Sequence, residues 1–233
     1  MIVLQGIVLG VLPFITIVVF VAGMWYRFAV WRKLPAPGMT LYPAPEGGTW
    51  SGVIKESLLF PGLFKTDKVF WGGAWMFHVL LALICIGHIR VFTDFPALWA
   101  AIGLSTTGVD IMSAAIGGAA GVLILLLTIY LMVRRISVER VREVTGLGDF
   151  IALLLVLAIL LTGNSMRFGS HFDLELTRTY FAGLFTFSSA AFPTGNMFML
   201  HFLLVQLLIM YIPFSKLLHF GGIFFSQMLL RRA

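Results

Sequence analysis

Residues 69–92, VFWGGAWMFHVLLALICIGHIRVF, decide the fold class of this chain. A helix that crosses a lipid bilayer needs about 20 mostly apolar residues. This stretch is longer than that, and Arg90 near its end is its only residue with a full charge at neutral pH. The stretch therefore predicts a transmembrane helix, and the two histidines inside it, His78 and His88, are its most unusual feature.

The composition of the whole chain agrees with a membrane location. Hydrophobic residues make up 60% of the 233 residues and charged residues 11%, and the mean hydropathy is +1.00. Soluble domains carry about 25% charged residues, and a chain of this length is too short to hide the excess in a larger core. The net charge of +6 does not indicate nucleic acid, because the basic residues flank apolar segments, as topology signals and anionic-lipid contacts do. The single cysteine, Cys85, excludes a disulfide framework and a covalent haem motif.

Five apolar stretches qualify as spans of one domain, 1–233. They lie at about 2–25, 69–92, 108–133, 148–168 and 196–225. The fifth contains Pro213, which predicts a kink or an interfacial extension after it. The loop 26–68 begins with many Pro and Gly residues, and its later part, Gly52–Phe64, is amphipathic enough to lie on the membrane surface.

The basic residues predict the orientation of the bundle. Lysine and arginine collect on the cytoplasmic side of membrane proteins, and 13 of the 16 basic residues fall in the first loop, the loop after span three and the C-terminal segment. Arg90, Arg167 and Arg178 remain for the other side. The sequence therefore predicts an outer N-terminus and a cytoplasmic C-terminus.

Four of the five histidines fall inside predicted spans, two on span two and two on span five. An ionisable side chain in the membrane is costly and indicates function, although a histidine can also hydrogen-bond a neighbouring helix. Because these spans run in opposite directions, His78 is expected opposite His219 near the inner face, and His88 opposite His201 near the outer face. The sequence therefore predicts two layers of paired histidines.

Two histidines per layer, with a single cysteine, Cys85, and no suitable carboxylate in spans two and five, favour haem iron over zinc. Two axial imidazoles leave no open coordination position, which is typical of electron transfer. The two histidines of span two are 10 residues apart, and those of span five are 18 residues apart. Along an ideal helix these spacings correspond to about 15 Å and about 27 Å. Helix tilt and the Pro213 kink are expected to absorb this mismatch. Glycines beside the histidines, Gly87 among them, either admit a porphyrin or serve helix packing.

These features resemble the cytochrome b gamma subunit of respiratory nitrate reductases. Within that superfamily they are most similar to the membrane cytochrome b of the complex linked to dissimilatory sulfite reductase, the Dsr complex. The matching stretches are Leu59–Phe64, Phe77-His78, Gly87–Thr93, Thr162-Gly163, Met166–Phe168 and Ile212–Gly222.

The resemblance implies two haem b groups held by the four histidines in the pairs given above. It also implies a quinone, menaquinone or ubiquinone, near the outer haem, and a cytoplasmic iron–sulfur subunit similar to heterodisulfide reductases near the inner one, with further membrane and periplasmic subunits. In the nitrate reductase branch a lysine at the outer end of span three helps to bind quinone, but Gly108–Met112 contains none. Asp110 is the nearest polar substitute, and Asp94 is a second candidate proton acceptor.

Other polar residues near the span ends have two interpretations each. Arg90 and Arg167 are candidates for binding haem propionates, or they extend to the interface from apolar stems. Lys216 and Ser215 are candidates for the inner propionates, or Lys216 only marks the cytoplasmic edge. His171, in the outer loop, is either a proton relay or a solvated residue.

The sequence thus predicts an all-α, integral membrane five-helix bundle in a prokaryotic cytoplasmic membrane. We interpret it as a di-haem electron-transfer subunit, without a catalytic site of its own, of a respiratory complex in sulfur or sulfite metabolism. It would connect the quinone pool with the iron–sulfur subunit. The alternatives are the gamma subunit of a nitrate reductase, a transporter that moves metal ions or protons through its histidines, and a scaffold whose histidines only hydrogen-bond.

Overall fold

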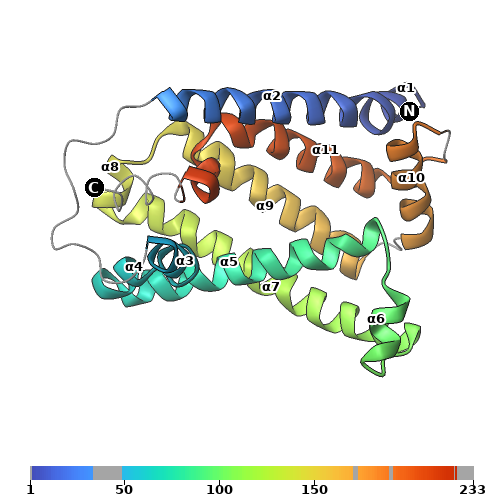
Figure 1. Ribbon diagram of the computed structural model, residues 1–233, viewed down its shortest axis with the longest axis horizontal. Helices are drawn as coiled ribbons and strands as arrows, with labels where there is room; N and C mark the ends of the chain where they lie inside the picture. The colour runs from blue at the N-terminus through green and yellow to red at the C-terminus, as the bar shows by residue number, and fades with distance from the viewer. Residues whose placement is uncertain (1, 34–48, 170–172, 189–190, 223, 225–233) are drawn as a thin grey trace.

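The structure is a computed structural model that describes residues 2–33, 49–169, 173–188, 191–222 and 224. Within these residues all regular secondary structure is helical, and five long helices lie roughly along one direction (Figure 1). The predicted all-α membrane bundle is therefore confirmed.

Five segments are long and apolar enough to cross a membrane, as the sequence predicted. They are Val3–Lys33, Lys68–Val91, Thr106–Ser137, Leu147–Phe168 and Asn196–Phe214. The first comprises α1 (Ile2–Gln5), the π-helix η1 (Gly6–Val11) and α2 (Leu12–Lys33); the second α5 (Lys68–His88) and η2 (Ile89–Val91); the others are α7 (Thr106–Ser137), α9 (Leu147–Phe168), and α11 (Asn196–Tyr211) with η3 (Ile212–Phe214).

Short helices cover the two ends of the bundle. The segment predicted to lie on the membrane surface forms α3 (Thr49–Leu59) and α4 (Pro61–Thr66), and the indole N–H groups of Trp71 and Trp75 donate to carbonyls at the end of α3. The remaining short helices are α6 (Pro96–Ala101), α8 (Glu139–Glu143), α10 (Leu174–Thr186) and η4 (Lys216–Leu218).

The long helices pack in a row rather than all against one another. In the order α5, α7, α9, α11, α2, each packs on the next, and Figure 1 shows α2 and α11 on one side, α5 and α7 on the other, and α9 between them. Phe77 of α5, Ile124 of α7 and Leu160 of α9 belong to one buried cluster. Extensive packing between α5 and α11 is not found among the described residues.

The basic residues mark the two ends of the bundle. The Arg90 end, with Arg167 and Arg178, includes α6 and α10. The Arg134 end, with Arg135, includes α3, α4 and α8, and Figure 1 shows these two groups of short helices at opposite ends.

The fifth span ends at Phe214, earlier than the predicted limit of 225. Proline has no N–H to donate, and its ring clashes with the preceding turn of a helix, so α11 gives way to η3 at Pro213. Ser215 is extended, and its hydroxyl then accepts the N–H of Leu217 to start η4. The turn lies close against α2 at Gly23, where an added Cβ would be only 2.7 Å from Cβ of Pro213. The lack of a side chain at Gly23 permits this approach. His219 therefore does not continue the helix of His201, and the rise of an ideal helix no longer applies.

Candidate functional site

The structure brings the four membrane histidines together as two facing pairs. The ring centres of His78 and His219 are 5.8 Å apart with the rings nearly perpendicular, at 86°. Those of His88 and His201 are 6.4 Å apart with the rings nearly parallel, at 12°. Each pair joins α5 to the segment formed by α11 and its extension.

Three of these histidines bond a carbonyl of their own helical segment through Nδ1. Because a carbonyl oxygen only accepts, Nδ1 carries the hydrogen in each case and Nε2 keeps its lone pair. The distances from Nδ1 to oxygen are 2.7 Å for His78 and Ala74, 2.7 Å for His88 and Ile84, and 3.0 Å for His219 and Lys216.

His201 differs, since its Nδ1 lies 2.9 Å from the hydroxyl oxygen of Thr162 on α9. That hydroxyl also lies within hydrogen-bonding distance of the carbonyls of Ala158 and Ile159. A hydroxyl that donates to either carbonyl is left to accept from the histidine, so His201 also has its hydrogen on Nδ1.

The separation of the rings suits one metal ion between the two members of a pair. With metal–imidazole bonds of about 2 Å, and a ring centre roughly 1 Å beyond the nitrogen, two rings on opposite sides of one ion have centres about 6 Å apart. No group of three or more His, Cys, Asp or Glu residues suited to a metal ion is found in the described part of the chain. A metal held by these pairs would therefore take its other ligands from elsewhere, as haem iron takes them from the porphyrin.

Aromatic rings enclose the His78 pair on one side. Phe60 and Phe77 both approach the His78 ring edge-on, at 5.4 Å between centres. Phe60 joins α3 to α4 with a positive φ of 49°, a backbone conformation that is uncommon for a bulky residue. The α3–α4 connection and helix α5 thus each place an apolar ring against His78.

A charged cluster lies directly beyond His88 at the Arg90 end. Arg90 pairs with Asp94 at 3.0 Å and with Asp110 at 2.8 Å, and Arg178 of α10 pairs with Asp94 at 2.6 Å. Burial raises the pKa of Asp94, but hydrogen bonds from Arg90, Trp99 and Arg178 outweigh it and hold that pKa at about 2. Asp110, our candidate quinone residue, is an exposed partner of Arg90 in this cluster.

The other two ambiguous basic residues, Lys216 and Arg167, also have protein partners. Lys216 lies 2.7 Å from the carboxylate of Asp149, whose side chain is 5% exposed. Arg167 donates to the carbonyl of Ser113 at 3.2 Å and lies against Gly117.

The structure shows a packing role for two of the glycines in the spans. Side chains of neighbouring helices occupy the space at Gly73, where Tyr130 packs, and at Gly121, where Asn164 packs, so these residues serve helix packing. A Cβ at Gly87, beside His88, would meet nothing within 4 Å.

Sequence reasoning missed two neighbours of the histidines, Thr162 and Phe60, and the partner of Lys216, Asp149. Each comes from an element distant in sequence, and a threonine or a phenylalanine in an apolar helix gives no signal of such a contact. His171 lies outside the described residues.

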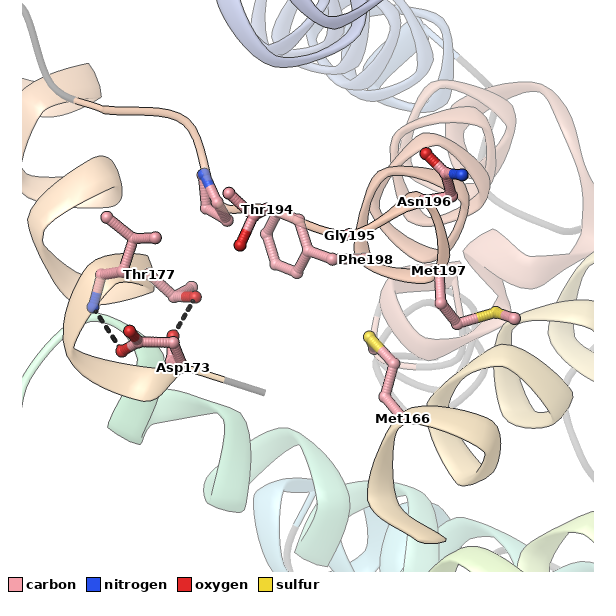
Figure 2. Close-up of a pocket in the computed structure, with 10 residues that line it drawn as sticks. Met166, Asp173, Thr177, Thr194, Gly195, Asn196, Met197 and Phe198 are labelled. Carbon is pink, nitrogen blue, oxygen red and sulfur yellow. Dashed lines mark hydrogen bonds between the residues drawn. The ribbon is translucent and has the colours of Figure 1, made fainter. Parts of the chain in front are cut away.

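A cavity of about 130 Å³ opens at the Arg90 end, one helical turn from His201. Figure 2 shows Met166 of α9 and Met197 of α11 on one side of it, and Asp173 and Thr177 of α10 on the other. Its volume is below the range of about 300 to 1,000 Å³ that is usual for small-molecule sites.

Comparison with known proteins identifies the family. The family model of the nitrate reductase gamma subunit matches residues 61–232. The chain is 32% identical to the Hdr-like menaquinol oxidoreductase cytochrome b-like subunit of Archaeoglobus fulgidus, over 95% of this chain and 78% of that protein. The protein with the same description from Archaeoglobus profundus is 27% identical, over 92% and 76%. The nitrate reductase gamma chain of Bacillus subtilis is 24% identical, over 68% and 61%.

These matches and the five spans define an integral membrane cytochrome b subunit of quinone-linked electron transfer. The chain belongs to the nitrate reductase gamma subunit family and is a multi-pass protein of a prokaryotic cytoplasmic membrane.

Proposed function

We propose that this chain holds two haem b groups, one between His78 and His219 and one between His88 and His201. On this proposal it conducts electrons between menaquinol and a cytoplasmic iron–sulfur subunit. The observation that carries the proposal is the geometry of the two pairs, with Nδ1 bonded to an oxygen and the ring centres 5.8 and 6.4 Å apart. A haem b supplies one-electron redox chemistry when bound, and two axial imidazoles keep other ligands off the iron.

Two buried arginine nitrogens support the fit of a haem at each of the two histidine pairs. Nε of Arg90 and Nε of Arg27 are buried and have no hydrogen-bond partner within the described residues. Unpaired buried donors of this kind are costly, and the propionates of a haem are anions that would accept from them. Arg90 lies two residues after His88, in η2.

Arg27 is the corresponding candidate for the other haem. It lies on α2 one turn beyond Gly23, which packs on Pro213, and one turn before Trp31, which packs on Gly222. Arg27 is therefore placed along the segment that carries His219. We therefore propose that Arg27, rather than Lys216, binds the propionates of the haem between His78 and His219, because Lys216 is already paired with Asp149.

The charge asymmetry supports a direction across the membrane. On the positive-inside rule the Arg134 end faces the cytoplasm, so the His78 pair would exchange electrons with the soluble partner. The His88 pair would then lie near the outer face and take electrons from menaquinol. Asp94 and Asp110 are the carboxylates nearest this outer pair along the chain. Asp110, whose side chain is 66% exposed, is proposed as the acceptor for the protons released there, because the contacts that hold the pKa of Asp94 at about 2 make that carboxylate a poor acceptor.

The relatives favour an iron–sulfur partner of the heterodisulfide reductase type over a nitrate reductase. The relative with higher identity and coverage is described as Hdr-like, and the nitrate reductase chain is more distant. The lack of a lysine around Gly108–Met112 points in the same direction. We propose a complex of the Dsr type in sulfur or sulfite metabolism, with further membrane and periplasmic subunits, and co-purification of the soluble subunit distinguishes it from nitrate reductase.

Haem content of purified variants tests the ligand assignment. Two b-type haems per chain are expected in the natural protein. The His78→Ala and His219→Ala variants should lose the same component, and the His88→Ala and His201→Ala variants the other. Two intact six-coordinate haems in His78→Ala would overturn the pairing, and the absence of a Soret band in the natural protein would favour a transporter instead.

A further inference from the structure

We infer that Thr162 is the positioning residue of His201, holding its ring from a neighbouring helix and tuning the electron affinity of the outer haem. The inference rests on the proposed function, because it concerns a haem bound by His201. Thr162 is 8% exposed, in the last third of the membrane-spanning α9, and its hydroxyl oxygen lies 2.9 Å from Nδ1 of His201.

The direction of this hydrogen bond follows from the surroundings. The single hydroxyl hydrogen of Thr162 has the carbonyls of Ala158 and Ile159 as acceptors, at 2.9 and 3.0 Å. The oxygen is then free to accept the Nδ1–H of His201, and Nε2 keeps its lone pair for a metal. A ligand histidine of this kind is oriented, and made a stronger donor, by the partner of its other nitrogen.

The other three histidines lack this arrangement, because their Nδ1 atoms bond carbonyls three or four residues earlier in their own segments. His201 instead has a side-chain hydroxyl, that of Thr162, as the acceptor for its Nδ1–H. Thr162 lies on α9, a helix that carries none of the four histidines. This hydrogen bond thus ties the His201 ring to α9 in addition to its own helix, α11.

Gly163, the next residue, leaves room for the same ring. A Cβ at Gly163 would lie 3.3 Å from Cε1 of His201 and 3.7 Å from Nδ1. Thr162 and Gly163 therefore position the His201 ring together. The hydroxyl of Thr162 sets the rotation of the ring, and the absence of a side chain at Gly163 lets the ring pack closely against α9.

Thr162→Val tests the inference, since valine keeps the shape and removes the acceptor. Loss of the hydrogen bond makes His201 a weaker donor and destabilises the ferric state. At a fixed solution potential, the reduced-to-oxidised ratio of the outer haem is therefore expected to rise about three- to tenfold, the equivalent of one ordinary hydrogen bond. The ratio of the inner haem should not change, and Thr162→Ser should restore the natural value.

Thr128→Val is a matched control, because Thr128 is fully buried in α7 and its hydroxyl also bonds the carbonyl four residues earlier, but among the described residues it has no hydrogen bond to a histidine. Gly163→Ala gives a second test, since it presses on the ring without removing the hydroxyl and should alter the electron paramagnetic resonance signal of the same haem. An unchanged ratio in Thr162→Val and an unchanged signal in Gly163→Ala would overturn the inference. If His201→Ala retained both haems, the proposed function itself would fail, which is a distinguishable result.

Discussion

The carboxylate of Asp149 and the ammonium group of Lys216 form a 2.7 Å ion pair, although the two residues are 67 positions apart. Asp149 lies at the start of α9, where it also accepts the N–H of Gly146. Lys216 opens η4, and its carbonyl oxygen lies 3.0 Å from Nδ1 of His219. The ion pair therefore ties the segment that bears His219 to α9, the helix that also holds His201 through Thr162.

Replacing Asp149 by Asn should loosen this segment and lower haem occupancy at the His78 pair. Lys216 is 72% exposed, so the loss of unfolding free energy is expected to be about 1 to 3 kcal/mol, below that of a fully buried pair. Haem per chain and thermal unfolding in detergent measure both effects. Glu139→Gln removes the same charge from an exposed site in α8, and equal behaviour of the two variants would contradict the prediction.

The bundle and the meeting of the histidines could be predicted because both depend on local sequence. About 20 apolar residues are required for each span, and the antiparallel order of spans two and five then fixes which histidines meet. The loop helices followed from the amphipathic pattern of Gly52–Phe64. Pro213 predicted a break in the fifth span. The close packing of the chain after this break on Gly23 of α2 could not be predicted, because no local pattern indicates it.

The surroundings of the histidines could not be predicted, because they are made by residues far apart in the chain. Thr162 lies 39 positions from His201. Lys216 was a candidate for a propionate on position alone, and only the fold shows that Asp149 already binds it. A single sequence gives the type of each side chain but not the partner that satisfies it.

A break in the first span gives a second prediction. Pro13 has no N–H to donate to a carbonyl of the preceding helical turn, and that turn forms the π-helix η1. Two side chains donate hydrogen bonds to carbonyls of this turn instead. Gln206 donates to the carbonyl of Val8 at 3.1 Å, and the Tyr180 hydroxyl to that of Leu9 at 2.7 Å. Burial raises the pKa of the Tyr180 hydroxyl, which therefore remains a donor at alkaline pH.

Tyr180→Phe should consequently lower the unfolding free energy by about 1 to 2 kcal/mol, because the carbonyl of Leu9 loses its donor in a buried site. Thermal unfolding in detergent provides the measurement. Tyr26→Phe removes a hydroxyl from an exposed tyrosine of α2 and should have little effect. The prediction is wrong if the two variants melt together.

The charged cluster at the Arg90 end predicts a dependence of stability on pH. The pKa of Asp94 is about 2 in the folded protein, against 3.8 as its ordinary value. A carboxyl whose pKa is lowered on folding stabilises the protein above the ordinary value, and this stabilisation is lost as the pH falls from about 4 to about 2. At pH 7 it amounts to roughly 2 kcal/mol.

Asp94→Asn should therefore be less stable than the natural protein at pH 7, and the difference should narrow as the pH falls below about 4. Asp110→Asn serves for comparison, because the side chain of Asp110 is 66% exposed and its pair with Arg90 should contribute less than about 1 kcal/mol. Melting temperatures from pH 7 to pH 3 decide the matter. A gap between Asp94→Asn and the natural protein that is independent of pH would count against the assigned role of Asp94.

The two histidine pairs differ in the angle between their rings, 86° for the His78 pair and 12° for the His88 pair. Each axial imidazole raises the energy of the iron d orbital that overlaps its filled π orbital. Parallel rings act on the same d orbital and separate it from its partner. Perpendicular rings act on one orbital each and leave the two nearly equal in energy.

The proposed haems should therefore give two different low-spin ferric signals in electron paramagnetic resonance. A rhombic signal is expected from the His88 pair, because its two d orbitals are well separated, and a highly anisotropic one from the His78 pair. His201→Ala should remove only the rhombic signal, and His219→Ala only the anisotropic one. Since Thr162 holds the His201 ring, Thr162→Val should displace the rhombic signal and leave the other in place. Two signals of the same shape in the natural protein would show that the ring angles of the two pairs do not differ in this way when haem is bound.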